Sequence, residues 1–358
     1  MRKSGVLESD IHDVLADNNI PWSMFRNSAV LITGATGLIG GLLVRTLSAA
    51  NLNYKLNIEI IAHGRNTDKG TALARECGIR FKAGDITKPI SDDSLPQTID
   101  FIFHCAAVTA SAVMVANPVE VITISIDGTK NILDLAHERN CRSFVFLSSM
   151  EVYGKTGLSE VTESDLGYID LSDPRSSYPE SKRLCELLCN AYATRYGVPV
   201  KIARPALTFG AGTPNDAGNT RVANQFARKA LAGEDIELHT PGSSVSNCCY
   251  TADAVRGLLT ILLKGKDGQA YNLSNPLACA TIREMADLVA NKVCEGRIGV
   301  AINVPKDIKK RGYAPDVGHK LNTDKLNALG WTPKYGLEYM FRRMIADWRG
   351  EPSPRHKR

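Results

Sequence analysis

The stretch AVLITGATGLIGGLLVRTL, residues 29–47, decides the fold. It runs from a β-branched apolar segment through three glycines spaced three residues apart into an apolar helical segment. Glycines let a backbone turn tightly and approach a pyrophosphate, whose charge is met by free N–H groups and by the positive end of the helix dipole. A glycine triplet that follows a strand and opens a helix therefore predicts a dinucleotide-binding turn. Its candidate cofactor-binding residues are Gly34, Thr36, Gly37, Leu38, Ile39 and Gly40.

On both sides of this turn, and beyond it, short β-branched runs alternate with longer helical runs. We expect strands at 29–34, 58–64, 80–85, 100–106, 143–149 and 199–205. We expect helices at 38–50, 67–77, 118–139 and 178–196. This alternation is typical of βαβ units, so the sequence predicts an α/β protein with a Rossmann-type, doubly wound parallel sheet. In such sheets ligands bind at the carboxyl ends of the strands.

Changes in pattern divide the chain into four parts. Residues 1–27 form a polar extension with a short helix expected around 10–18, and residues 28–205 form the dinucleotide-binding domain. After residue 205 Gly and Pro become frequent, which indicates a smaller α+β substrate-binding lobe over 206–348, with a helix near 219–232. An exchange of strands or helices between the two lobes is left open. Residues 349–358 form a basic tail.

Composition narrows the class of protein. Of 358 residues, 44% are hydrophobic and 23% are charged, and the net charge is only +5, so we expect a globular protein that binds no nucleic acid. No apolar run is long enough for a membrane span, and acidic residues follow the basic N-terminus, so a cytoplasmic location is expected. The nine scattered cysteines contain no CxxC pair, which predicts reduced core residues and no metal site.

The end of the second strand bears on the choice of cofactor. An acidic residue there accepts hydrogen bonds from the ribose hydroxyls of NAD, whereas Arg accommodates the 2′-phosphate of NADP. This strand runs into AHGRN, residues 62–66, which has no acid and contains Arg65, so the strand end taken alone favours NADP. Asp85 and Ile86 follow the third strand and are candidates to reach the adenine, although Asp in such a turn also acts as a turn former.

The segment SSYPESKRLCE, residues 176–186, sets Tyr178 four positions before Lys182 at the start of a helix. Residues four apart lie on the same helix face. A phenol has a pKa near ~10 and is a poor base at neutral pH unless a nearby cation favours the phenolate. A tyrosine tuned by Lys182 can take a proton from an alcohol while a hydride leaves the same carbon for nicotinamide. The pair therefore predicts an oxidoreductase step.

Four motifs in order carry a resemblance: TGATGLIG, HCAA (104–107), LSSMEVYG (147–154) and YPESK (178–182). Together they resemble the extended short-chain dehydrogenase/reductases, in particular the NAD-dependent nucleotide-sugar epimerase/dehydratase group, over about residues 28–345. The resemblance implies Tyr178 as catalytic base, Lys182 as its tuner and ribose ligand, and Ser149 as a hydroxyl that shares a hydrogen bond with the sugar oxygen. It also implies a homodimer formed by two long helices, and a cofactor groove lined by Ala106, Ala107 and Pro205.

Members of that group begin by oxidising the sugar, usually at C4, and differ in the later steps. Sugar dehydratases typically have an acid where this chain has Met150, which cannot donate a proton, whereas Glu151 remains a candidate base. We therefore rank 4-epimerisation first, loss of carbon dioxide or water by C5 chemistry second, and an NADP-linked carbonyl reduction third. A sensing scaffold that binds NAD(P) without turnover is the alternative outside the enzymes.

The substrate itself is hard to read from the sequence. The group commonly has an Asn and an Arg near the nucleotide diphosphate, at positions where this chain has Leu207 and Ser246. Charge-assisted bonds to a diphosphate are strong, so compensating residues are expected. The candidates on the substrate side are Arg221, Arg311 and Ser111.

Overall fold

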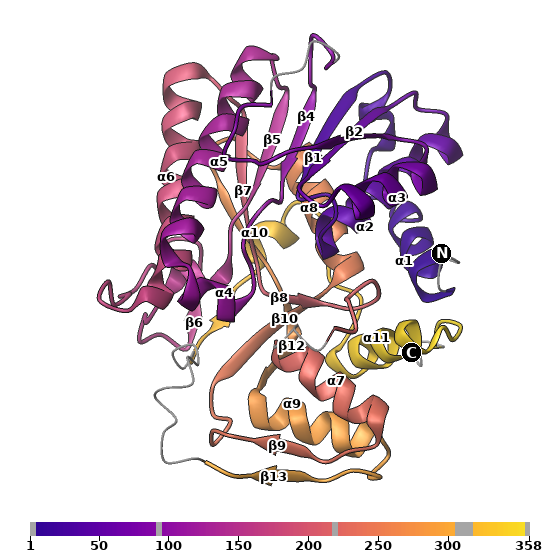
Figure 1. Cartoon of the computed structure of the whole chain (residues 1–358), viewed down its shortest axis with the longest axis vertical. Coiled ribbons are helices and arrows are strands. Elements are labelled where there is room, and N and C mark those ends of the chain that lie inside the picture. Colours follow the sequence, from indigo (N-terminus) through magenta and orange to yellow (C-terminus); the bar gives the residue numbers. More distant parts are fainter. Residues whose placement is uncertain (1–4, 91–94, 217–220, 305–317, 355–358) are drawn as a thin grey trace.

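A seven-stranded parallel sheet organises the computed structural model, which describes residues 5–90, 95–216, 221–304 and 318–354 (Figure 1). The strand order is β11-β7-β5-β4-β1-β2-β3, and neighbouring strands pair in parallel. The strands are β1 (Ala29–Thr33), β2 (Glu59–Gly64), β3 (Arg80–Ala83), β4 (Phe101–His104), β5 (Ser143–Leu147), β7 (Val200–Pro205) and β11 (Ala270–Leu273). The predicted Rossmann-type sheet is confirmed.

Helices cover both faces of the sheet, as expected for strands that are apolar along their whole length. On one face lie α5 (Pro118–Glu138) and α6 (Ser177–Tyr196), which pack side by side in Figure 1. On the other lie α2 (Leu38–Tyr54), α3 (Thr67–Cys77) and α8 (Thr251–Lys264). The four helices expected before residue 200 are present, but α2 is one turn longer than the predicted 38–50.

The C-terminal half builds a second lobe and also returns to the first. The second lobe holds a three-stranded sheet in the order β12-β10-β8, a two-stranded sheet of β9 and β13, and three helices. These elements are β8 (Leu207–Phe209), β9 (Ile236–Leu238), β10 (Val245–Tyr250), β12 (Asn275–Thr281), β13 (Val300–Ile302), α7 (Val222–Ala232), α9 (Ile282–Leu288) and α11 (Leu337–Arg349). Strand β11 and helix α8 return to the seven-stranded sheet. The expected boundary between the two lobes at residue 205 stays a prediction.

Short elements connect these parts. Strand β6 (Glu160–Val161) pairs with β14 (Lys320–Leu321), and helices α4 (Ser111–Ala116) and α10 (Asp324–Asn327) are single turns or little more. All nine cysteines lie in the described residues and none is disulfide-bonded; six of them are buried. Within the described ranges, none of the helices combines the length and apolarity that a membrane crossing requires.

The N-terminal extension is folded onto the body of the protein. It forms α1 (Gly5–Leu15) and a 3₁₀ turn (Trp22–Phe25), and α1 contacts α2, α8 and α11. Asp10 is fully buried and pairs with Arg343 of α11, while the Tyr250 hydroxyl donates to its other oxygen at 2.7 Å. Because the partners of α1 come from both halves of the chain, the extension ties the sheet domain to the C-terminal helix.

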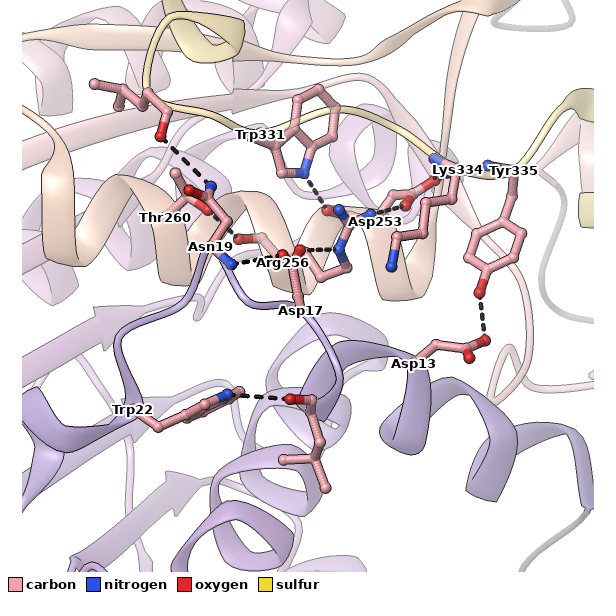
Figure 2. A network of polar contacts seen from close by, with 12 residues as sticks. Asp13, Asp17, Asn19, Trp22, Asp253, Arg256, Thr260, Trp331, Lys334 and Tyr335 are labelled. Atoms are coloured by element: carbon pink, nitrogen blue, oxygen red, sulfur yellow. Dashed lines mark hydrogen bonds and ion pairs between the residues drawn. The ribbon is translucent and has the colours of Figure 1, made fainter. Parts of the chain in front are cut away.

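A second polar cluster lies just after α1 (Figure 2). Arg256 of α8 donates from Nε to Asp17 at 2.5 Å and from Nη1 to Asp253 at 2.8 Å. The other oxygen of Asp253 accepts the backbone N–H groups of Lys334 and Tyr335 at 2.9 and 3.1 Å. Buried charges are stable only when they are paired and hydrogen-bonded in this way. Arg256 therefore joins three segments that are far apart in the sequence.

Candidate active site

The glycine-rich turn between β1 and α2 has the tight geometry expected of a dinucleotide cradle. Gly34 has a φ of +64°, and a Cβ there would lie 2.8 Å from the backbone of Cys105 and Ala106. A Cβ on Gly40 would lie 2.4 Å from the carbonyl oxygen of Gly34, so only glycine fits at either position. Gly37 precedes the first residue of α2 and has no side chain to cap it. The first N–H groups of α2 thus face outward, which fits a pyrophosphate.

This turn opens into a cleft of about 1080 Å³ at the carboxyl ends of the strands. The first lobe contributes the turn itself, the end of β2 with the N-cap of α3, and the residues after β4 and β5. The second lobe contributes β8, α7 and β10. Predicted residues that line the cleft are Gly34, Thr36, Gly37, Leu38, Ile39, Gly40, Arg65, Ile86, Ala106, Ala107, Ser111, Ser149, Glu151, Tyr178, Lys182, Pro205 and Arg221.

Tyr178, Lys182 and Ser149 meet inside this cleft. Tyr178 and Lys182 lie in the first turns of α6 and both are buried, as is Ser149 at the end of β5. The Nζ atom of Lys182 lies 5.9 Å from the centre of the Tyr178 ring and donates to the carbonyl oxygen of Leu147 at 2.7 Å. The three side chains predicted from separate motifs are therefore close together, and all three line the cleft.

The ionisation of Tyr178 is set by burial and by several charges. Burial raises the pKa of Tyr178 to about 12, and Glu151 adds to the rise, whereas Ser149, Arg221 and Arg175 oppose it. Burial also lowers the pKa of Lys182. Ser149 and these two arginines are thus the main protein groups that favour the phenolate. The expected tuning of Tyr178 by Lys182 stays a proposal.

Glu151 lies beside the tyrosine and is paired with an arginine that the sequence analysis did not select. Arg175 donates from Nη2 to both carboxylate oxygens of Glu151, at 3.0 and 2.8 Å. Arg175 is 6% exposed, lines the cleft, and its Nε atom has no partner in the described part of the chain. The neighbouring Met150 also lines the cleft. A carboxylate that accepts two bonds from a guanidinium is poorly suited to donate a proton.

The end of the cleft beside β2 and β3 differs from the expectation in one residue. Ile86 and Arg65 line it, but Asp85 does not. The Oδ1 atom of Asp85 accepts from the backbone N–H of Thr87 at 3.0 Å, and this bond lowers the pKa of Asp85. The structure thus places Asp85 as a turn-forming residue, the alternative that the sequence left open. His63, which the sequence analysis missed, lines the cleft instead.

On the substrate side, Arg221 precedes α7 and donates from Nη2 to the carbonyl oxygen of Thr109 at 3.4 Å, which links the two lobes across the cleft. Ser111 begins α4 at the same edge. Leu207 and Ser246, where the sequence departs from the resembled pattern, also line the cleft. Arg311 lies outside the described residues.

Two side chains that line the cleft, Arg175 and His63, were not predicted from the sequence. Arg175 stands three positions before Tyr178, one helical turn away, so its spacing was a usable signal. His63 is the penultimate residue of β2, and its position in the sequence gives no signal that it faces the cleft. Metal ligation is a separate question: among the described residues, no group of three or more His, Cys, Asp or Glu side chains could hold an ion.

Comparison with known proteins agrees with this geometry. The family model described as "NAD dependent epimerase/dehydratase family" matches residues 30–274. The chain belongs to this family. Among curated relatives, UDP-glucuronic acid decarboxylase 5 of Arabidopsis thaliana is 32% identical over 90% of both chains. Human dTDP-D-glucose 4,6-dehydratase is 25% identical over 88% of both chains.

Solved structures of the same fold superpose on nearly the whole of this chain. An epimerase from Methanothermobacter thermautotrophicus superposes with a TM-score of 0.76 at 24% identity, covering 92% of this chain and 94% of the other. The UDP-glucose 4-epimerase of Thermotoga maritima gives 0.75 at 21% identity, covering 90% and 98%. At these identities the structures show the fold alone. Family membership and the curated relatives make the chain an enzyme of the NAD-dependent epimerase/dehydratase family.

Proposed function

We propose that this enzyme converts a nucleotide sugar without net oxidation or reduction, by transient oxidation at C4 followed by 4-epimerisation. The observation that carries the proposal is the convergence of Tyr178, Lys182 and Ser149 in one cleft beside the glycine-rich turn. The bound nicotinamide dinucleotide supplies the hydride acceptor and returns the hydride. The glycine-rich turn supports binding of that cofactor, because Gly34 and Gly40 leave room only for a close approach of backbone and ligand.

In the proposed reaction the protein moves one proton at the sugar. Tyr178 accepts the proton of the C4 hydroxyl, and the Ser149 hydroxyl donates a hydrogen bond to the same oxygen. Lys182, whose Nζ is held by the Leu147 carbonyl, places a positive charge near the phenolate that forms. The C4 ketone then rotates in the cleft. As the hydride is added to the opposite face of C4, Tyr178 returns the proton to the C4 oxygen.

Dehydration is disfavoured at this site. Loss of water from the sugar needs a group that donates a proton to the departing hydroxyl. Met150 has no such proton, and both oxygens of Glu151 accept from Arg175. Epimerisation requires neither residue to transfer a proton, which is why it stays the first proposal.

Decarboxylation is the second candidate, and the curated relatives favour it. The relative at 32% identity is named as a UDP-glucuronic acid decarboxylase. A ketone at C4 makes a carboxyl group on C5 a β-keto acid. The bond from C5 to the carboxyl carbon then breaks, carbon dioxide leaves, its bonding electrons form an enolate at C4, and C5 later takes a proton. Arg175 is a buried cation within the same cleft, and its Nε has no partner among the described residues.

Mass analysis separates these functions. The purified enzyme is incubated with a panel of UDP- and dTDP-linked hexoses and hexuronic acids, and the products are resolved by chromatography and mass spectrometry. A new isomer of unchanged mass supports 4-epimerisation, whereas loss of carbon dioxide supports decarboxylation. Loss of water, or a gain of two hydrogens with consumption of added NADPH, would contradict both.

Replacing Glu151 with Gln tests the role of the carboxylate. If Glu151 only positions Arg175, Glu151→Gln lowers kcat by less than about tenfold, because the amide still accepts hydrogen bonds. A loss of about a hundredfold or more would mean that Glu151 transfers a proton, since general acid–base groups contribute about 10²–10⁴. The matched control is Glu180→Gln, which makes the same change in the pair of Glu180 with Arg183 on α6; the two glutamates are 34% and 32% exposed, and this variant should leave kcat unchanged.

We also propose that the protein forms a homodimer through α5 and α6. The two helices expose large apolar side chains that a second copy would cover: Val119, Ile122, Leu184 and Leu187. Exposed apolar patches of this kind are typical of interaction surfaces. Light scattering on the purified chain is expected to give twice the mass of one chain, and a single-chain mass would contradict the proposal.

A further inference from the structure

The end of β2 lies directly against the glycine-rich turn and carries no carboxylate. His63 pairs with Thr33 of β1 in the sheet register, and a Cβ on Gly64 would lie 3.4 Å from the Thr36 hydroxyl. His63, Gly64, Arg65 and Asn66 all line the cleft. Side chains at this point reach the adenosine ribose of a dinucleotide bound to the turn. We infer that this strand end selects NADP(H) over NAD(H), with Arg65 contacting the 2′-phosphate.

Arg65 is available for such a contact. It is exposed, it lines the cleft, and no hydrogen bond or salt bridge ties it to another side chain within the described ranges. Its charge lowers the pKa of Asp85, whose carboxylate already accepts from Thr87 and does not line the cleft. A guanidinium binds a phosphate with charge-assisted bonds, and its fork of donors matches phosphate geometry.

His63 is the second, independent observation. It is the penultimate residue of β2, is 2% exposed, and its Nδ1 atom has no partner in the described part of the chain. Burial, with the nearby Lys82, lowers the pKa of His63 to about 4, so the imidazole is neutral at physiological pH. A neutral ring does not repel a phosphate, whereas the carboxylate that selects NAD would repel it. The buried, unpartnered Nδ1 also means that a polar atom at this strand end lacks a hydrogen bond within the described ranges.

Helix α3 adds to the attraction. It spans eleven residues and begins at Thr67, two positions after Arg65, and the Asn66 side chain accepts from the N–H of Lys69 in its first turn. The positive end of a helix dipole favours an anion at this position. Asp68 lies in the same turn but does not line the cleft. Arg65, the start of α3 and the neutral His63 therefore all favour a phosphate at this strand end.

The inference concerns the cofactor and is separate from the proposed sugar reaction. An epimerase that holds NADP(H) still returns its hydride to the sugar, so a preference for the phosphorylated dinucleotide does not imply a net reductase. If NAD proves to be the tighter ligand, the assignment of Arg65 fails while the proposed sugar chemistry remains open. If the sugar panel fails, the binding preference remains testable.

Binding measurements on the full-length chain, freed of copurified dinucleotide, test this inference. Titration calorimetry is expected to show NADP⁺ binding at least about tenfold more tightly than NAD⁺, because only the 2′-phosphate offers Arg65 charge-assisted hydrogen bonds. Arg65→Ala should abolish the preference while NAD⁺ affinity stays within about twofold, which also shows that the variant is folded. Arg195→Ala, which removes an exposed arginine from α6, is the control and should change neither affinity.

A second variant, at Gly64, is designed to reverse the preference between the two cofactors. The nearest atoms to a Cβ on Gly64 lie at 3.4 Å or beyond, and Gly64 has no positive φ, so a side chain fits there. Gly64→Asp places a carboxylate at the ribose and should turn the preference toward NAD⁺. NAD⁺ binding as tightly as NADP⁺ in the unmodified chain, or a preference for NADP⁺ that survives Arg65→Ala, would overturn the inference.

Discussion

Replacing Tyr178 with Phe is expected to lower kcat by about a thousandfold or more while dinucleotide affinity changes by less than about twofold. The substitution removes only a hydroxyl, so the ring keeps its buried contacts with Met114 and Val121. The variant loses the group that takes the proton from the sugar, and general acid–base groups contribute about 10²–10⁴ to the rate. Initial rates on the substrate found in the nucleotide-sugar panel, together with calorimetric binding of the dinucleotide, measure the two quantities.

The same helix offers a matched control for this variant. Tyr192 is as buried as Tyr178, at 8% and 7% exposure, but its hydroxyl donates to Asp134 at 2.5 Å, outside the cleft. Tyr192→Phe should therefore keep kcat within about twofold. A Tyr178→Phe enzyme that turns over at a normal rate would remove Tyr178 as the base and, with it, the proposed reaction.

Replacing Arg256 with Met is expected to cost about 3–5 kcal/mol of the free energy of unfolding. The change leaves the carboxylates of Asp253, fully buried, and Asp17 without their shared cation, and breaking a buried pair from one side has an effect of this size. Met keeps most of the packing volume, so the loss reports the charge. Equilibrium unfolding in urea at pH 7.5 measures it, with far-ultraviolet circular dichroism as the probe.

The effect of Arg256→Met should also depend on pH. Burial raises the pKa of Asp253 to about 6, and Arg256 opposes the rise. A raised carboxyl pKa in the folded state gives stability that is present at low pH and lost as the pH increases through that pKa. Without Arg256 the pKa of Asp253 rises further, so the variant keeps losing stability above pH 6, where the unmodified protein no longer does. The deficit is therefore larger at pH 8 than at pH 5.

An exposed ion pair provides the comparison for this prediction. Arg283 and Asp287 pair one helical turn apart on α9, with side chains 59% and 46% exposed. Arg283→Met should cost no more than about 0.5 kcal/mol, because exposed helix pairs contribute little. If Arg256→Met behaves like Arg283→Met, the cluster in Figure 2 does not hold the N-terminal extension in place.

Much of the first domain could be predicted because its signals are local. Each of the six expected strands lies in one short run of the sequence, and the helix predicted at 67–77 matches α3 residue for residue. The site residues followed from motifs in which each residue stands near the end of a strand, where a parallel sheet gathers its ligands. That is why Gly34 and Ser149 could be predicted to line one cleft, and Tyr178 joins them from the first turn of α6.

The rest depends on contacts between distant parts of the chain. Nothing in AYNL, residues 270–273, indicates that it joins the sheet beside β7, because a short apolar run looks the same in either lobe. The pairing of Asp10 with Arg343, and of Asp17 with Arg256, joins residues hundreds of positions apart. The two interpretations of Asp85 could not be separated from the sequence, because one carboxylate can face a ligand or close its own turn, and in the structure its Oδ1 accepts from Thr87.

The placement of β11 has a consequence for synthesis on the ribosome. Strand β7, which is buried in the finished sheet, gains its outer neighbour only when β11 has been made, about 65 residues later. At about 5–20 residues per second, the nascent chain carries an open apolar edge for roughly 3–13 s. Translation pauses between these strands should therefore increase dependence on chaperones, and synonymous codon changes there should alter yield without altering the protein.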